Sequence, residues 1–249
     1  MNADVFVYCG VKCGSTTLHN TFRHNGFSTV HCHYNEHFQR EVAHTNTITV
    51  FDAMRRSAEL RPTGHVYIVD SYRDPIERLI STMFEQIHEK IPLYRSMTIP
   101  QLIAWFNTNL LFTTQRHPMD EVMQHFDVPS FTTFDFTKRY NLATKGRLVF
   151  IKIRFADIQD WGEILTVAFG RPIRLFSKNL TEQKHVYDLY REFKRHYRLP
   201  AVYLDEILPQ NKTFRIYNTK EEQAAYIRHW TQRIAPRHNG QLKTSTEII

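Results

Sequence analysis

Cysteine, glycine and long apolar runs are all scarce in this chain of 249 residues. The three cysteines, Cys9, Cys13 and Cys32, lie close together near the start, so they cannot form a disulfide framework across the fold. Free thiols beside a turn favour a reducing compartment, and we expect a cytoplasmic protein. No stretch approaches the roughly twenty apolar residues of a membrane span. The first ten residues, MNADVFVYCG, lack the basic region of a signal peptide.

The composition is that of a globular chain with an excess of positive charge. Hydrophobic residues make up 42% of it, enough for one substantial core and too many for a disordered tail. Thirty-two Lys and Arg against twenty-five Asp and Glu give a formal net charge of +7. That excess suits an anionic ligand, namely nucleotide phosphates, a charged glycan or a nucleic acid, without choosing among them.

Strand-like and helix-like patterns alternate along the chain. Short apolar runs predict strands within 4–10, 27–33, 65–72, 148–153 and 173–176. Amphipathic patterns with start and stop signals predict helices over about 15–25, 49–60, 75–87, 99–112, 157–169, 181–196 and 219–234. The alternation predicts a single α/β domain in three layers, with a mainly parallel central sheet and helices on both faces. Ligands in such sheets bind beyond the carboxyl ends of the strands.

The segment 10–17, GVKCGSTT, joins the first predicted strand to the first helix. In that place several backbone N–H groups and a helix dipole point at one spot, which suits an anion. Lys12 adds a cation, and the hydroxyls of Ser15, Thr16 and Thr17 can donate to phosphate or sulfate oxygens. The alternative is a helix cap of small residues that binds no ligand.

A P-loop NTPase is the nearest rival for this segment. Its lysine directly follows the second glycine, and a Ser or Thr then holds magnesium. Here Ser15 takes the lysine's position, and Lys12 precedes Gly14 by two residues. The pattern therefore favours a metal-free phosphate site.

The segment 69–81, VDSYRDPIERLIS, again runs from a strand into a helix. Arg73 falls at the end of the strand, and Ser81 follows about two helical turns later near the same face. Arginine offers a forked, permanently charged donor to a phosphate, and serine adds a hydroxyl. Arg78 has an alternative structural role, pairing with Asp74 at i,i+4 or with a neighbouring loop. Two such motifs in this order are harder to dismiss than either alone.

Both motifs resemble those of PAPS-dependent sulfotransferases, where PAPS is 3′-phosphoadenosine-5′-phosphosulfate. Lys-x-Gly-Ser-Thr-Thr-Leu is similar to their 5′-phosphosulfate loop, and Arg-Asp-Pro-x-x-Arg-x-x-Ser to their 3′-phosphate signature. The resemblance implies a P-loop-like fold and two sets of cofactor contacts: Lys12, Cys13, Gly14, Ser15, Thr16 and Thr17 at the 5′ side, and Arg73 and Ser81 at the 3′-phosphate.

Over the rest of the chain the resemblance is closest to bacterial carbohydrate sulfotransferases of the capsular-polysaccharide type. It implies a PAPS-binding core at about 1–90 plus 145–180 of the single domain 1–249, and acceptor-side helical segments at about 95–142 and 181–249. The implied reaction moves a sulfuryl group from PAPS to a hydroxyl of a carbohydrate or polysaccharide and leaves adenosine 3′,5′-bisphosphate. At 155–157 the sequence Phe-Ala-Asp stands where Tyr-Glu-Asp is more usual.

Such a transfer needs a base for the incoming hydroxyl and charge stabilisation for the leaving group. Lys12 is expected to stabilise the leaving 5′-phosphate. Strand alternation places His31 and His33 on the same side, and His33, nearer the end of its strand, is the preferred base. Glu36 is the substitute, because family members use either His or Glu. No second ligand pair accompanies His31, Cys32, His33 and His37, so no metal is expected.

Two other functions stay open. A small-molecule or nucleotide kinase on a related fold would need a Walker lysine, which is missing. A non-catalytic polyanion-binding module would rest on the net charge alone. We expect no nucleic-acid partner, and the sequence sets no oligomeric state.

The basic helix expected at 181–196 is either a cleft wall for an acceptor or, as is commoner, a solvated face. Asn179 and Lys184 are further, weaker candidates for nucleotide contacts. The aromatic residues at helical spacing in this region favour core packing over a sugar platform; they are Tyr187, Tyr190, Phe193 and Tyr197.

Overall fold

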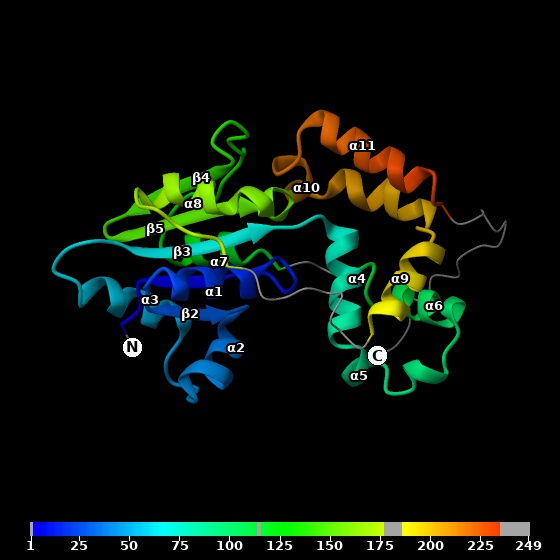
Figure 1. The fold of residues 1–249 in the computed structure, drawn as a ribbon, viewed down its shortest axis with the longest axis horizontal. Coiled ribbons are helices and arrows are strands. Elements are labelled where there is room, and N and C mark those ends of the chain that lie inside the picture. Colours follow the sequence, from blue (N-terminus) through cyan, green and yellow to red (C-terminus); the bar gives the residue numbers. More distant parts are fainter. Residues whose placement is uncertain (1, 114–115, 177–185, 235–249) are drawn as a thin grey trace. The chain divides into compact units, whose positions relative to one another are not determined.

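The computed structural model describes residues 2–113, 116–176 and 186–234. The chain divides into two compact units, Met1–Lys194 and Arg195–Ile249. The first unit contains a five-stranded sheet in the order β2-β1-β3-β5-β4 (Figure 1). Its strands are β1 (Val5–Tyr8), β2 (Thr29–Cys32), β3 (Val66–Tyr72), β4 (Tyr140–Lys145) and β5 (Leu148–Arg154). Four of these five strands are parallel, which confirms the predicted α/β class with a mostly parallel sheet.

Strand β4 is the exception, since it pairs antiparallel with β5 at the edge of the sheet. No strand was predicted at these residues. Its sequence, YNLATK, has little apolar character and leaves Leu142 exposed. Pairing with the fully buried β5 therefore creates the strand, whereas a local apolar pattern does not.

Helices cover both faces of the sheet. On one face, α1 (Ser15–His24) and α8 (Trp161–Phe169) bury residues such as Leu18, Phe22 and Trp161 against the strands. On the other face, α3 (Val50–Glu59) and α7 (Pro118–His125) bury Met54 and Val122 among others. Both clusters include side chains from β1, β3 and β5, because successive strand residues point to opposite faces.

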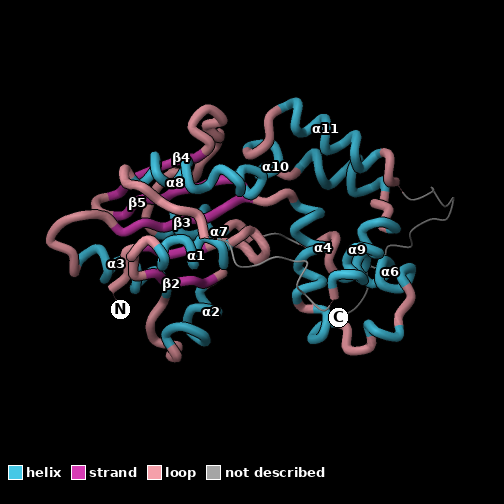
Figure 2. Tube along the Cα trace, viewed as in Figure 1, coloured by secondary structure: helices cyan, strands magenta, loops and turns pink. Residues whose placement is uncertain are grey.

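The remaining elements of the first unit are helices of 3 to 11 residues; Figure 2 draws the helices in cyan. They are α2 (Asn35–Phe38), the π-helix η1 (Gln39–Ala43), α4 (Pro75–Glu85), α5 (Ile87–Lys90), η2 (Tyr94–Ser96), α6 (Ile99–Asn109) and η3 (Phe155–Asp160). Helix α9 (Tyr187–His196) follows residues 177–185 and buries Phe193 against Phe84 and Phe106. Phe193 is thus a core residue, as predicted.

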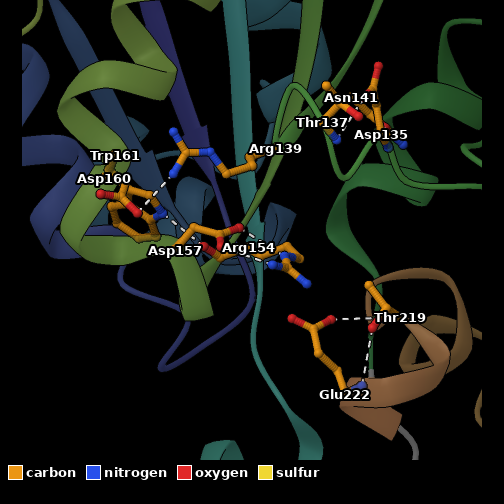
Figure 3. Close-up of polar contacts among 10 residues, drawn as sticks. All are labelled: Asp135, Thr137, Arg139, Asn141, Arg154, Asp157, Asp160, Trp161, Thr219 and Glu222. Carbon is orange, nitrogen blue, oxygen red and sulfur yellow. Dashed lines mark hydrogen bonds and ion pairs between the residues drawn. The ribbon is translucent and has the colours of Figure 1, made fainter.

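The second unit is helical over its described residues. It contains η5 (Tyr203–Ile207), η6 (Leu208–Gln210), α10 (Lys212–Ile216) and α11 (Lys220–Thr231). Tyr197 is fully buried and packs edge-on against Trp230. Thr219 and Glu222 form a capping box that begins α11 (Figure 3). The single domain over 1–249 stays a prediction, as does its division into core and acceptor-side segments.

The predicted strand at 173–176 is wrong. Its backbone polar groups bond to side chains of neighbouring helices and not to another strand. Thr21 Oγ1 accepts from Phe176 N at 3.0 Å, Asn25 Oδ1 accepts from Arg174 N at 3.0 Å, and Thr166 Oγ1 accepts from Ile173 N at 2.9 Å. The segment does not belong to the sheet, because these side chains satisfy its hydrogen bonds.

Other element boundaries differ by a turn or so from the predictions. Helix α4 ends at Glu85, and a break at Gln86 separates it from α5. Residues 155–160 form a 3₁₀ turn before α8, while α7 was not predicted. Of the helix predicted at 181–196, residues 181–185 lie outside the described part of the chain. Across the described ranges, no helix has the length and apolar character needed to cross a bilayer.

Candidate anion-binding site

The loop after β1 has an unusual backbone conformation at two residues. Lys12 and Gly14 both have positive φ, 64° and 84° respectively. A Cβ built on Gly14 would lie 2.6 Å from Trp161 and 3.1 Å from Phe155, so no side chain fits there. Gly14 is also the N-cap of α1 and provides no side-chain cap. The first N–H groups of α1 therefore have no partner within the helix and face the loop.

Two side chains of the second motif, 69–81, form hydrogen bonds with the backbone of this loop. Arg73 Nη1 donates to the Lys12 carbonyl oxygen at 2.8 Å, and Ser71 Oγ donates to the Cys13 carbonyl oxygen. Two segments about sixty positions apart in the sequence are thus in direct contact. Arg78 also lies under the loop, because a Cβ on Gly10 would be 3.4 Å from Arg78 Nη1. The predicted pairing of Arg78 with Asp74 stays a prediction.

One cavity of about 500 Å³ brings most of the predicted site residues together. Those that line it are Lys12, Gly14, Ser15, Thr16, Thr17, His33, Arg73 and Ser81. Cys13 does not line it: the side chain is buried, and Sγ lies 3.7 Å from the Val11 carbonyl oxygen. Burial raises the pKa of the Cys13 thiol, so the thiol stays neutral. Cys13 therefore packs beneath the loop and does not face the cavity.

The cationic wall of the cavity has two side chains with defined contacts. The Arg73 guanidinium stacks over the Phe155 ring at 4.4 Å. The Lys12 ammonium forms an ion pair with Glu85 Oε2 at 3.0 Å. Together with the N-terminus of α1 these groups place positive charge at one end of the cavity, where the Glu85 carboxylate also lies.

Phe155 is held in place by the residues around it. Arg154 forms two hydrogen bonds with the Asp157 carboxylate, at 2.8 and 2.9 Å, and the Trp161 indole N–H donates to the Arg154 carbonyl oxygen at 2.8 Å (Figure 3). Arg139 Nη1 forms an ion pair with Asp160 Oδ2, at the end of the same turn, at 2.9 Å. The sequence Phe-Ala-Asp at 155–157 therefore supplies an aromatic ring to the cavity and an ion pair behind it.

His33 has one ring nitrogen fixed by the backbone. Its Nδ1 lies 2.9 Å from the Cys9 carbonyl oxygen. Since a carbonyl oxygen only accepts, Nδ1 must bear the hydrogen, which leaves a lone pair on Nε2. Burial lowers the pKa of His33 below its ordinary value, and the nearby Lys12 charge lowers it further, while the bond to Cys9 opposes both. The imidazole is therefore neutral at neutral pH and can accept a proton.

The structure does not bring Glu36 to the cavity. Its side chain is 65% exposed and pairs with Arg116 at 3.3 Å. A hydrogen bond from its own backbone N–H, together with Arg116, lowers the pKa of Glu36. His31 does not line the cavity either; burial lowers its pKa to about 3. Among the residues of the described ranges, no group of three or more metal-ligand side chains is arranged to hold an ion.

Sequence reasoning missed several residues that line the cavity. Tyr34, His37, Arg40 and Glu41 come from the segment after β2, and Glu85 comes from α4. Glu85 follows Ser81 by four positions on one helix, a spacing that places both on one face. That signal was present in the sequence and could have found Glu85.

A buried ion pair next to the loop also went unpredicted. Asp70 of β3 and Lys152 of β5 sit opposite each other on neighbouring strands, and both side chains are almost fully buried. Asp70 directly precedes Ser71, whose hydroxyl bonds to the loop.

A scan of known protein families, a search of curated proteins and a search of solved structures each find no match for this chain.

Proposed function

We propose that this protein is a PAPS-dependent sulfotransferase that sulfates a hydroxyl group of a carbohydrate or polysaccharide, on a three-layer P-loop-like fold. The main support is the contact between the two motifs. Arg73 Nη1 bonds to the backbone of Lys12, and both side chains line one cavity with Ser81. A single nucleotide with a phosphate at each end of its ribose can therefore reach both.

The chemistry of the cavity fits such a nucleotide. Lys12, the hydroxyls of Ser15 to Thr17 and the N-terminus of α1 would bind the 5′-phosphosulfate. Arg73 and Ser81 would bind the 3′-phosphate, and the Phe155 ring keeps the Arg73 guanidinium oriented. The bound nucleotide would supply an activated sulfuryl group.

The residues of the chain would then perform three tasks. His33 Nε2 takes the proton from the acceptor hydroxyl as the oxygen attacks sulfur. Lys12 and the first N–H groups of α1 stabilise the charge that develops on the leaving 5′-phosphate. The acceptor enters along the wall of Tyr34, His37 and Arg40, which lies in the same cavity as His33. Aromatic, imidazole and guanidinium groups suit a hydroxyl-rich or acidic sugar.

A kinase on a related fold is the runner-up. Magnesium nucleotide chemistry of that kind uses a lysine after the second glycine and a carboxylate at the end of a neighbouring strand. Ser15 occupies the first position. The buried carboxylate nearest the loop, Asp70, is neutralised by Lys152 and does not line the cavity. This arrangement favours the sulfotransferase.

Calorimetric titration with adenosine 3′,5′-bisphosphate tests the proposal, with Mg-ATP as the competing ligand. We expect the bisphosphate, and not Mg-ATP, to bind and to protect the protein from thermal unfolding. Arg73→Ala should weaken binding about tenfold or more, the usual effect of losing a hydrogen bond to a charged group.

Arg171→Ala is a matched control. Arg171 also donates to one backbone carbonyl oxygen, that of Asn25 at 3.0 Å, and stacks over one ring, that of Phe27 at 4.5 Å. It lies outside the cavity, so its loss should leave nucleotide affinity unchanged. Absence of bisphosphate binding, or equal affinity in Arg73→Ala and the wild type, would refute the proposal. Salt-sensitive heparin binding that survives Lys12→Ala would instead support the polyanion module.

A further inference from the structure

The ammonium group that should meet the ligand is already engaged by a carboxylate of the protein. Lys12 Nζ and Glu85 Oε2 are 3.0 Å apart, and both side chains line the cavity. Lys12 is 20% exposed and Glu85 is 43% exposed. Glu85 is the last residue of α4, one turn beyond Ser81. A negative charge therefore stands within the region that the proposed function assigns to an anion.

This placement opposes anion binding in two ways. An incoming phosphate or sulfate must share or displace the carboxylate before it gains the full attraction of Lys12. The carboxylate also repels any anion that comes within a few ångströms of it. If tight nucleotide binding were the only requirement at position 85, a glutamate would be unfavourable there.

We propose that Glu85 is an internal competitor for the anion ligand, holding the Lys12 ammonium until a phosphate or sulfate group displaces it. Glu85 is thus a positioning residue that acts through Lys12 and lowers the affinity of the site. With PAPS as the ligand the inference rests on the proposed function, but the competition applies to any anion bound at Lys12.

The expected effect is moderate, because the pair is partly exposed to water. Exposed ion pairs contribute little, and loss of the nearby repulsion adds a comparable amount. Glu85→Gln should therefore tighten binding of adenosine 3′,5′-bisphosphate about threefold to tenfold. Glutamine keeps the size of the side chain and removes its charge, so the fold should be retained.

Glu89 provides a matched control within the same cavity. It belongs to α5, carries the same charge and lines the cavity, and within the described ranges the structure records no ion pair for it. If net charge alone governed affinity, Glu89→Gln would tighten binding as much as Glu85→Gln. Competition for Lys12 predicts a change of less than about twofold for Glu89→Gln.

A double-mutant cycle makes the test decisive. The affinity of each protein for adenosine 3′,5′-bisphosphate is measured by calorimetry in the wild type, Glu85→Gln, Lys12→Ala and the double variant. We expect Glu85→Gln to tighten binding in the wild-type background and to have a clearly smaller effect when Lys12 is alanine, where only the direct repulsion of the anion is lost. Unchanged or weaker binding in Glu85→Gln, or an equal gain in both backgrounds, would overturn the inference.

The same set of variants is titrated with inorganic sulfate, so that the two proposals can fail separately. Binding of sulfate but not of the bisphosphate would reject the proposed nucleotide while leaving the competition measurable. Binding of both ligands with no gain in Glu85→Gln would reject the competition alone. Urea unfolding of each variant verifies that affinity is compared between folded proteins.

Discussion

At Gly14 two physical demands fall on one residue. The backbone is left-handed, with φ of 84°, and the space where a Cβ would stand is occupied by Trp161 and Phe155. In the sequence, the same residue lies within the expected anion-binding segment 10–17. The structure adds that this glycine lets α1 pack against the turn that presents Phe155 to the cavity.

Gly14→Ala should lower the free energy of unfolding by about 2–4 kcal/mol, because a left-handed alanine and a steric overlap are added together. Gly64→Ala separates the two effects, since Gly64 has the same φ of 84° and nothing within 4 Å of its Cβ position. It should cost only about 1 kcal/mol. Urea unfolding measures both variants, and equal losses would show that the aromatic contact is unimportant.

Lys12 has the same kind of backbone without the freedom of glycine, with φ of 64°. Strain of this type persists only where surrounding contacts enforce it, and it often occurs at functional sites. Here the hydrogen bond from Arg73 to the Lys12 carbonyl oxygen provides such a contact. The arginine of the second motif therefore has a structural task in addition to its proposed ligand contact.

At the scale of single elements, α1 joins the anion loop to the segment 173–176. Thr21 lies in its last turn and Asn25 is its C-cap residue, and both bond to the backbone of that segment. The apolar pattern of residues 173–176 suggested a strand, but its partners are side chains. The apolar periodicity of a segment indicates which of its side chains are buried. It does not indicate which groups accept or donate the hydrogen bonds of its backbone N–H and C=O groups.

Thr21→Val should lower the free energy of unfolding by about 1–3 kcal/mol, because the partly buried backbone groups of Phe176 lose their partner. The substitution preserves the shape of the side chain. Thr144→Val on the exposed edge strand β4 is the control and should change stability by less than about 0.5 kcal/mol. Chemical denaturation compares the two, and similar values would contradict this account of the segment.

At the scale of the whole molecule, a row of imidazoles links the sheet to the cavity. The ring of His31 lies 5.4 Å from that of His19 and 5.0 Å from that of His33, which in turn lies 5.2 Å from His37. Burial lowers the pKa of each of the four. The hydrogen-bonding partners are the Thr29 hydroxyl at His19 and the Cys9 carbonyl oxygen at His33. Charged groups also act on the row: Arg23 on His19, Lys12 and Asp70 on His33, and Arg40 and Glu41 on His37.

These lowered pKa values predict acid sensitivity. Each folded-state pKa lies below the value of about 6.5 expected in the unfolded chain, so the unfolded state binds more protons at acid pH. The stability that the neutral histidines contribute is therefore fully present well above pH 6.5 and is lost as the pH falls from there toward the folded-state pKa, which for His31 is about 3.

His31→Asn should make the decline in unfolding free energy between pH 6.5 and 4 less steep. His65→Asn, at an exposed position just before β3, should leave the slope as it is. Urea unfolding at several pH values measures the slopes, whatever the stability of each variant at pH 7.5. The same slope in His31→Asn and the wild type would contradict the assignment.

Local patterns alone determined a large part of this protein. The alternation of strands and helices predicted the mostly parallel sheet, because the buried side of a strand or helix is marked by apolar residues that are close together in sequence. The order of the two strand–loop–helix motifs likewise predicted that Lys12, Arg73 and Ser81 would share one edge. Parallel strands bring their carboxyl ends to the same edge whatever the loops contain.

Only the tertiary structure decided how the side chains of the site contact one another. It turned Cys13 inward, left Glu36 in solvent with Arg116, and placed Glu85 on Lys12. These outcomes depend on backbone angles at single residues and on contacts between distant segments, such as the 3.0 Å pair between positions 12 and 85. No periodicity along the chain encodes a contact of that range, since it arises when separate elements pack together.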